Sequence, residues 1–145
     1  MKKLSVFIAL VSLTAVLMAK GPAITFKESV HDFKEIEEMG GLAKHDFEFT
    51  NTGDATLVIN SVRASCGCTT PSWTRTPIEP GKKGVISVAY NPQGRPGSFI
   101  KTITVRSNAS EEDAQMLQIK GKVVNTKQSK GPKSRNRSEA VPYTY

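Results

Sequence analysis

Two cysteines separated by one glycine, Cys66 and Cys68, are the side chains of this 145-residue chain best suited to chemistry. In an extended strand, the Cα atoms of alternate residues lie about 6.6 Å apart, near the upper limit for a disulfide. Gly67 lets the backbone turn and bring the cysteines closer. Four interpretations stay open: a structural disulfide, a thiolate metal site, a redox pair, and a cross-link to another chain. Because thiols of exported proteins tend to oxidise, we favour the structural disulfide.

A metal site at these cysteines would need further ligands. Two thiolates suit Cu(I) or Zn²⁺, but a closed structural zinc site has four ligands. The chain's two histidines are His31 and His45, and His45 shares its predicted strand face with Phe47. We therefore expect His45 in or beside the core and do not expect the histidines to converge into a closed site. The sequence predicts no metal site and no cofactor, with Cys66 and Cys68 as the alternative metal ligands.

Sequence patterns of known catalytic sites are missing. The chain has no Gly-x-Ser-x-Gly, no His-Glu-x-x-His and no glycine-rich phosphate loop before a helix. No thioredoxin-like βαβ pattern surrounds the cysteines. Acidic clusters within residues 35–38 and 111–113 are of the kind that usually lies solvated on the surface. We predict no catalytic residue and a protein that is not an enzyme.

The elements that must position the cysteines are short strands. Residues 43–50 alternate between apolar and polar side chains, and Gly, Pro, Asn and Asp separate the apolar runs. We expect Gly53, in the turn that follows, to use a positive φ. The predicted strands lie near residues 24–26, 30–33, 43–50, 57–62, 85–90, 99–106 and 116–124. About seven short strands in this length predict an all-β, antiparallel two-sheet sandwich.

Four motifs together resemble a known family. They are Phe47-x-Phe-Thr-Asn-Thr-Gly-Asp-Ala, Ala64-Ser-Cys-Gly-Cys-Thr, Pro77-Ile-x-Pro-Gly and Gly97-Ser-Phe. In this order they resemble the bacterial envelope family called domain of unknown function 1573, whose hallmark is Cys-Gly-Cys-Thr. The resemblance implies an immunoglobulin-like sandwich related to the abnormal-spindle/hydin and major-sperm-protein domains, which are mostly interaction modules. It carries over no catalytic residue.

The N-terminal segment predicts export. Lys2 and Lys3 precede an uncharged apolar run from Leu4 to Met18, and Ala19 supplies a small residue for signal peptidase. The run is shorter than the about 20 residues that span a bilayer. We therefore predict a cleaved signal peptide at residues 1–19, a single domain at residues 20–124, and a periplasmic, secreted or cell-surface location.

The positive charge of the chain lies mostly outside the predicted domain. Of the net +7, residues 125–145 contribute +4 and the first two lysines +2, which leaves about +1 for the domain. We therefore expect no specific nucleic-acid binding. Residues 125–145 are predicted to form a basic disordered tail, able to contact anionic membranes or glycans weakly. The candidate residues for that contact are Lys127, Lys130, Lys133, Arg135 and Arg137.

These observations favour an exported, non-catalytic module of the bacterial cell envelope. Its partners would be other envelope proteins, bound at sheet edges or loops, because an antiparallel sandwich retains edges that can pair with a further strand. The alternative function is a thiol-based metal-binding or redox protein centred on Cys66 and Cys68.

Overall fold

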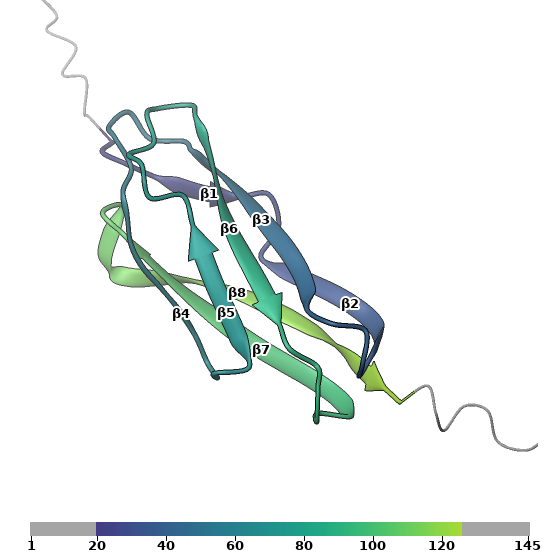
Figure 1. The fold of residues 1–145 in the computed structure, drawn as a ribbon. Helices are drawn as coiled ribbons and strands as arrows, with labels where there is room; N and C mark the ends of the chain where they lie inside the picture. The colour runs from purple at the N-terminus through teal and green to yellow at the C-terminus, as the bar shows by residue number, and fades with distance from the viewer. Residues whose placement is uncertain (1–19, 126–145) are drawn as a thin grey trace, which may run out of the picture.

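The computed structural model describes residues 20–125, so the predicted signal peptide and the basic residues of the tail lie outside the described part. Within residues 20–125, no helix is long and apolar enough to cross a membrane. The strands are β1 (Ile24–Phe26), β2 (Val30–Glu37), β3 (Ala43–Asn51), β4 (Ile59–Ala64), β5 (Thr69–Trp73), β6 (Lys83–Tyr90), β7 (Gly97–Ser107) and β8 (Ser110–Val124) (Figure 1).

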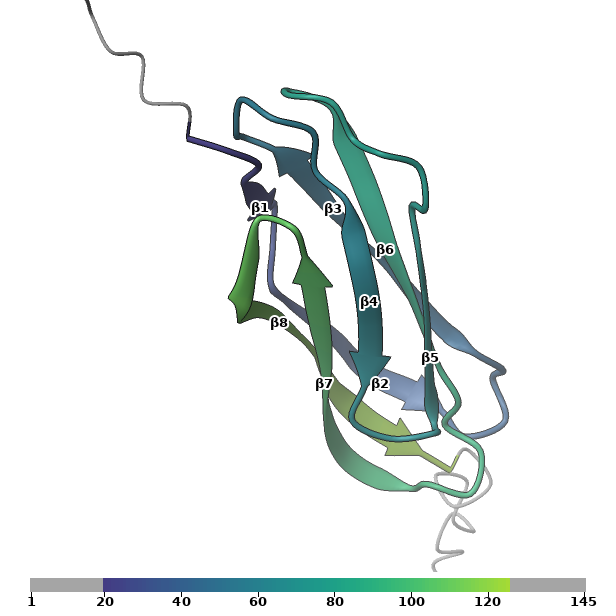
Figure 2. The same ribbon diagram turned by 90° about the vertical axis from the view of Figure 1, so that its left-hand side faces the viewer.

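The strands form two facing four-stranded sheets, in the orders β1-β3-β6-β5 and β2-β8-β7-β4. Figure 2 shows the two layers from the side. The predicted all-β two-sheet sandwich is therefore confirmed. All the strand pairs are antiparallel except β2 with β8, which is parallel. The described residues contain eight strands, where the sequence predicts about seven, and the additional strand is β5.

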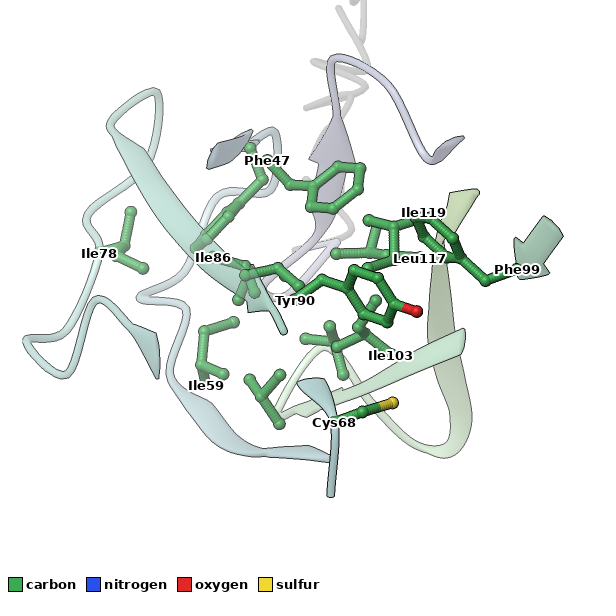
Figure 3. Packing of buried hydrophobic residues seen from close by; sticks show 14 of the residues in the cluster. Phe47, Ile59, Cys68, Ile78, Ile86, Tyr90, Phe99, Ile103, Leu117 and Ile119 are labelled. Carbon is green, nitrogen blue, oxygen red and sulfur yellow. The ribbon is translucent and has the colours of Figure 1, made fainter. Parts of the chain in front are cut away.

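The core lies between the inner faces of the two sheets (Figure 3). Phe47, Ile86 and Val88 come from the first sheet, and Ile103 and Ile119 come from the second; all are at most 1% exposed. Burying a side chain of this size contributes about 1.5–3 kcal/mol. The alternation of apolar residues along β3 and β6 thus places one face of each strand in the core and leaves the other face in solvent.

Strand β5 is absent from the sequence prediction because Pro71 lies in its middle. A proline removes a main-chain donor, so proline within a strand is usually confined to an edge. Pro71 lies opposite Val88 of β6, and β5 is the edge strand of its sheet. The N–H of Thr74 donates to the carbonyl of Val85, 3.0 Å away. By antiparallel alternation, the main-chain groups of Pro71 face away from β6, where a missing N–H breaks no hydrogen bond.

The turn after β3 differs from its prediction. Gly53 is absent from the residues with positive φ, so the expected left-handed conformation is wrong. A Cβ at Gly53 would instead collide with the main chain of Gly21 and Ala23. The buried amide of Asn51 organises the same turn, because its Oδ1 accepts from the N–H of Gly53 at 3.0 Å and its Nδ2 donates to the carbonyl of Ile78 at 2.9 Å. Gly53 is therefore a site of close chain approach.

Candidate functional site

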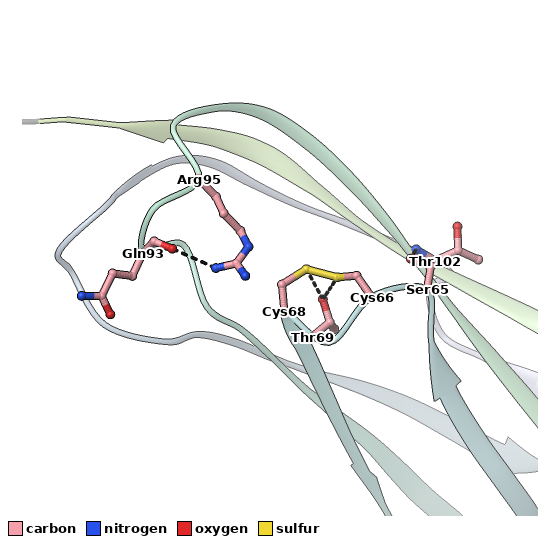
Figure 4. The surroundings of a disulfide bond; sticks show 7 residues. All are labelled: Ser65, Cys66, Cys68, Thr69, Gln93, Arg95 and Thr102. Carbon is pink, nitrogen blue, oxygen red and sulfur yellow. Dashed lines mark hydrogen bonds between the residues drawn. A yellow bond between two sulfur atoms is a disulfide. The ribbon is translucent and has the colours of Figure 1, made fainter.

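The chain crosses from one sheet to the other at the cysteine pair. Between β4 and β5, Cys66 and Cys68 are joined by a disulfide, and their Cα atoms are 5.3 Å apart (Figure 4). This separation lies inside the usual disulfide range, because the chain turns at Gly67 and is not fully extended there. Cys68 is buried at the edge of the core, whereas Cys66 is half-buried.

Hydrogen bonds hold both ends of this corner. The N–H of Ser65 donates to the carbonyl of Thr102 at 2.9 Å, and the N–H of Thr102 donates to Oγ of Ser65 at 3.2 Å. On the other side, the N–H of Asn91 donates to the carbonyl of Cys68 at 2.9 Å. Oγ1 of Thr69 lies 3.6 Å from the sulfur of Cys66. The disulfide therefore sits in a corner that is anchored to β7 of one sheet and to the end of β6 of the other.

The other loops at this end of the sandwich meet around Glu38. Its N–H donates to the carbonyl of Val124, and its carboxylate accepts from the N–H of Gly94 at 3.0 Å and from Nδ2 of Asn125 at 3.1 Å. The loop that follows exposes two large apolar side chains, Met39 and Leu42. Figure 2 shows these turns and the end of β8 gathered at the lower end of the molecule. We call this the disulfide end.

A shallow groove of about 610 Å³ runs from the disulfide end along the outer face of β3, β6 and β5. Its lining is built mostly from small or polar residues: Lys44, Asp46, Gly67, Thr70, Ser72, Ser87, Ala89 and Asn91, with Leu42, Cys68 and Val88. One amine and one carboxylate among small side chains make a surface for contact. They do not form a nucleophile with an adjacent base.

The sandwich has four edge strands, and three of them are poorly suited to pairing with another chain. Strand β1 has only three residues, and β5 carries Pro71 on its free edge. Strand β2 is bulged between Asp32 and Glu35, with Lys34 at a φ of 60°. The N–H of Lys34 donates to Asp32 and holds the pKa of that carboxyl below its ordinary value. Short length, proline, bulges and lysine are the usual means of blocking an edge.

Strand β4 is the remaining edge. The N–H of Ser65 donates to Thr102, so the alternation of the β4–β7 ladder directs the main-chain groups of Arg63 toward β7. The N–H and C=O groups of Val62 and Ala64 then face the free side of the sheet. The regular part of this edge, from Ser61 to Ala64, carries no proline and follows a single register shift near Ile59. It can accept an additional strand.

The two histidines lie together, apart from the disulfide. The rings of His31 on β2 and His45 on β3 stack with centroids 3.5 Å apart and an interplanar angle of 8°. The histidines therefore meet each other, a contact that the sequence does not predict, and the group that they form contains Glu28 and neither cysteine. Burial lowers the pKa of His31 below its ordinary value, and repulsion from His45 lowers it further. No local pattern of residues indicates this contact, because it depends on how β2 crosses β3.

The fold defines the class of protein: an all-β, immunoglobulin-like sandwich of two four-stranded sheets. The chain belongs to the family described as Protein of unknown function (DUF1573), which matches residues 24–123. This confirms the resemblance drawn from the four motifs. The fold and the family suggest a non-enzymatic domain. No curated protein is significantly similar to this chain.

Solved structures support the same class. A protein of unknown function from Porphyromonas gingivalis W83 matches with a TM-score of 0.63 and 21% identity, over 77% of this chain and 51% of that chain. The present chain thus spans about half the length of that protein. A human domain, the ASH / PapD-like domain 7 of CEP192, matches with a TM-score of 0.58 and 14% identity over 86% and 99% of the two chains. The YadV chaperone matches with a TM-score of 0.51 and 9% identity over 69% and 51%. At these identities the similarity establishes the fold alone.

Proposed function

We propose that this protein is an exported, non-catalytic module that binds an extended segment of another cell-envelope protein along the open edge of β4. The observation that carries the proposal is the difference between the four edges. Strand β4 keeps outward N–H and C=O groups at Val62 and Ala64, while β1, β2 and β5 are short, bulged or interrupted by proline.

Strand addition explains how such a module can bind without a deep pocket. Main-chain hydrogen bonds to the added strand supply affinity, and the side chains that flank the edge supply specificity. On β4 the exposed Arg63 lies between the two outward-facing residues, so an acidic side chain in the bound segment would be favoured there. The similarity to the YadV chaperone supports a role in contacting other proteins.

Export is the second part of the proposal and rests on residues 1–19. The mature chain should begin at Lys20, after cleavage behind Ala19. N-terminal sequencing of protein from the native host tests this directly. An intact Met1 in the membrane fraction would show that the apolar run is retained as an anchor.

Site-specific photo-cross-linking tests the binding edge. A photoreactive residue at Arg63 should capture one discrete envelope protein, whereas the same residue at Thr25, on the exposed side of β1, should not. The variant Ala64→Pro removes one outward N–H without breaking the ladder to β7, and it should abolish capture from position 63. Equal capture from both positions, or capture that survives Ala64→Pro in a folded protein, would reject this edge as the binding surface.

The alternative is a thiol-based metal-binding or redox function at Cys66 and Cys68. The half-exposure of Cys66 favours it, because an accessible disulfide can be attacked by an external thiolate. The anchoring of Ser65 and Cys68 to both sheets favours the structural role. The double variant described in the Discussion separates the two functions.

A further inference from the structure

Three potential metal ligands meet at the side of the sandwich where β2 of one sheet passes β3 of the other. They are Glu28, in the connection between β1 and β2, His31 on β2 and His45 on β3. One ligand atom from each side chain lies within 4.8 Å of the others. Three side chains that can each donate an electron pair to a metal ion thus lie close together where the two sheets meet.

One of these ligand atoms lacks a hydrogen bond. Nε2 of His45 is shielded from solvent and makes no hydrogen bond within residues 20–125, although Oε1 of Glu28 lies 2.9 Å away. A buried polar atom without a hydrogen-bond partner destabilises the fold. A metal ion that accepts the lone pair of Nε2 would supply the missing partner.

Aromatic neighbours hold the two imidazole rings in place. His31 meets the ring of Phe33 edge to face at 4.6 Å, and His45 meets Phe47 in the same way at 4.6 Å. The two rings also stack on each other with centroids 3.5 Å apart, which places both imidazoles beside the Glu28 carboxylate. Glu28, which is 46% exposed at its side chain, supplies the negative charge and leaves a path from solvent.

The ligand set matches a particular class of ion. Two imidazole nitrogens with one carboxylate oxygen suit Zn²⁺ and similar first-row divalent ions, with water in the remaining position. Mg²⁺ prefers an all-oxygen shell and does not fit. Two ligands of one tetrahedral zinc ion lie about 3.4 Å apart, given zinc–ligand distances of about 2.0–2.1 Å. The three ligand atoms, now within 4.8 Å of one another, therefore need to close by up to about 1.4 Å, with the stacked rings tilting toward the ion.

We propose that Glu28, His31 and His45 bind a first-row divalent transition-metal ion, with Zn²⁺ the expected occupant. The bound ion would cross-link β2 to β3, and so one sheet to the other, on the side of the sandwich opposite the β4 edge. Because the unfolded chain does not hold the three ligands together, bound metal should raise the thermal stability of the fold. The site is independent of the proposed partner binding and of the cysteines.

Zinc titration of the untagged, oxidised, chelator-treated full chain tests the proposal. Calorimetry and elemental analysis should give one Zn²⁺ per chain, with a rise in melting temperature, and Mg²⁺ should have no effect. Glu28→Gln changes an exposed residue and should leave the fold intact while weakening zinc binding about tenfold or more. His31→Gln should abolish binding. Glu48→Gln, an exposed carboxylate on β3 outside the cluster, is the matched control and should bind as the wild type does.

The cysteine double variant Cys66→Ser/Cys68→Ser identifies the source of any binding. Under the proposal it retains the zinc site and its dependence on Glu28. The proposal is overturned if the oxidised chain binds no zinc, if Glu28→Gln and His31→Gln bind as the wild type does, or if binding appears only after reduction and disappears in the cysteine variant. The last result would place the metal on the thiolates.

Discussion

Pro71 lies directly opposite Val88 in the pairing of β5 with β6, at a position whose main-chain groups face the free edge of the sheet. Because the ring nitrogen has no proton, a strand approaching β5 finds no donor there. Pro71 thus explains why β5 is absent from the sequence prediction and also makes the free edge of β5 unsuited to pairing. Strand β4 is then the edge strand that is suited to strand addition.

Restoring a main-chain N–H at position 71 should allow the free edge of β5 to pair with another chain. The variant Pro71→Thr adds an outward N–H and a residue with high strand propensity, so it should change the free energy of unfolding by no more than about 1 kcal/mol. It should also self-associate more strongly than the wild type in sedimentation experiments over a range of concentrations. If the variant sediments as the wild type does at every concentration, the proline does not protect this edge.

Substitution by alanine should lower the free energy of unfolding at Gly53 and leave it almost unchanged at Gly67. Gly53→Ala places a Cβ against the main chain of Gly21 and Ala23, which cannot give way easily, so we expect a loss of about 1–3 kcal/mol. Gly67, between the cysteines, has open space around the position of a Cβ and no positive φ. Gly67→Ala should stay within about 0.5 kcal/mol of the wild type.

Urea denaturation of the two alanine variants measures both effects. Similar stability of the two variants would contradict the account of Gly53 as a point of close chain approach.

The cysteine pair should contribute modestly to stability and nothing to binding. Because the ring closed by Cys66 and Cys68 is very small, it restricts the unfolded chain little. Cys66→Ser with Cys68→Ser should therefore cost no more than about 2 kcal/mol in denaturation experiments. Reduction of the wild type should produce a similar loss, and cross-linking from Arg63 should persist in the double variant. A disulfide-exchange activity that vanishes in a folded double variant would instead establish the redox function.

The basic residues beyond the sandwich should account for binding to polyanions. A chain ending at Val124, where β8 ends, should melt as the full chain does. Binding of the full chain to heparin or anionic vesicles should weaken steeply with salt, and the shortened chain should lose it. Equal binding by the two chains would place the anionic contact on the sandwich itself.

The alternation of apolar residues was sufficient to predict the sandwich, because the inner positions of β3 and β6 follow a period of two. Contacts between segments distant in the sequence were less predictable. The close approach of Gly53 to Gly21 depends on where the N-terminal segment crosses the β3 turn. The stacking of His31 on His45 depends on the crossing of two sheets, and no local pattern encodes that geometry.

The candidate binding edge of β4 could also be predicted only in part from the sequence. Its composition is visible in the sequence from Ile59 to Ala64. Its openness is not, since it depends on which strands neighbour β4 and on which residues the ladder to β7 leaves facing outward. The proline of β5 and the bulge of β2 can be interpreted as features that prevent pairing only when both strands are known to be edge strands.

Amide hydrogen exchange at Val62 and Ala64 tests the central claim most directly. In the free chain both amides should exchange quickly, while the amide of Arg63, bonded to β7, should be protected and serve as an internal control. Addition of the partner recovered by cross-linking should slow exchange at Val62 and Ala64 by roughly tenfold or more, because both N–H groups become hydrogen-bonded in the added strand. Unchanged exchange at these two amides, with new protection elsewhere on the surface, would contradict strand addition at β4.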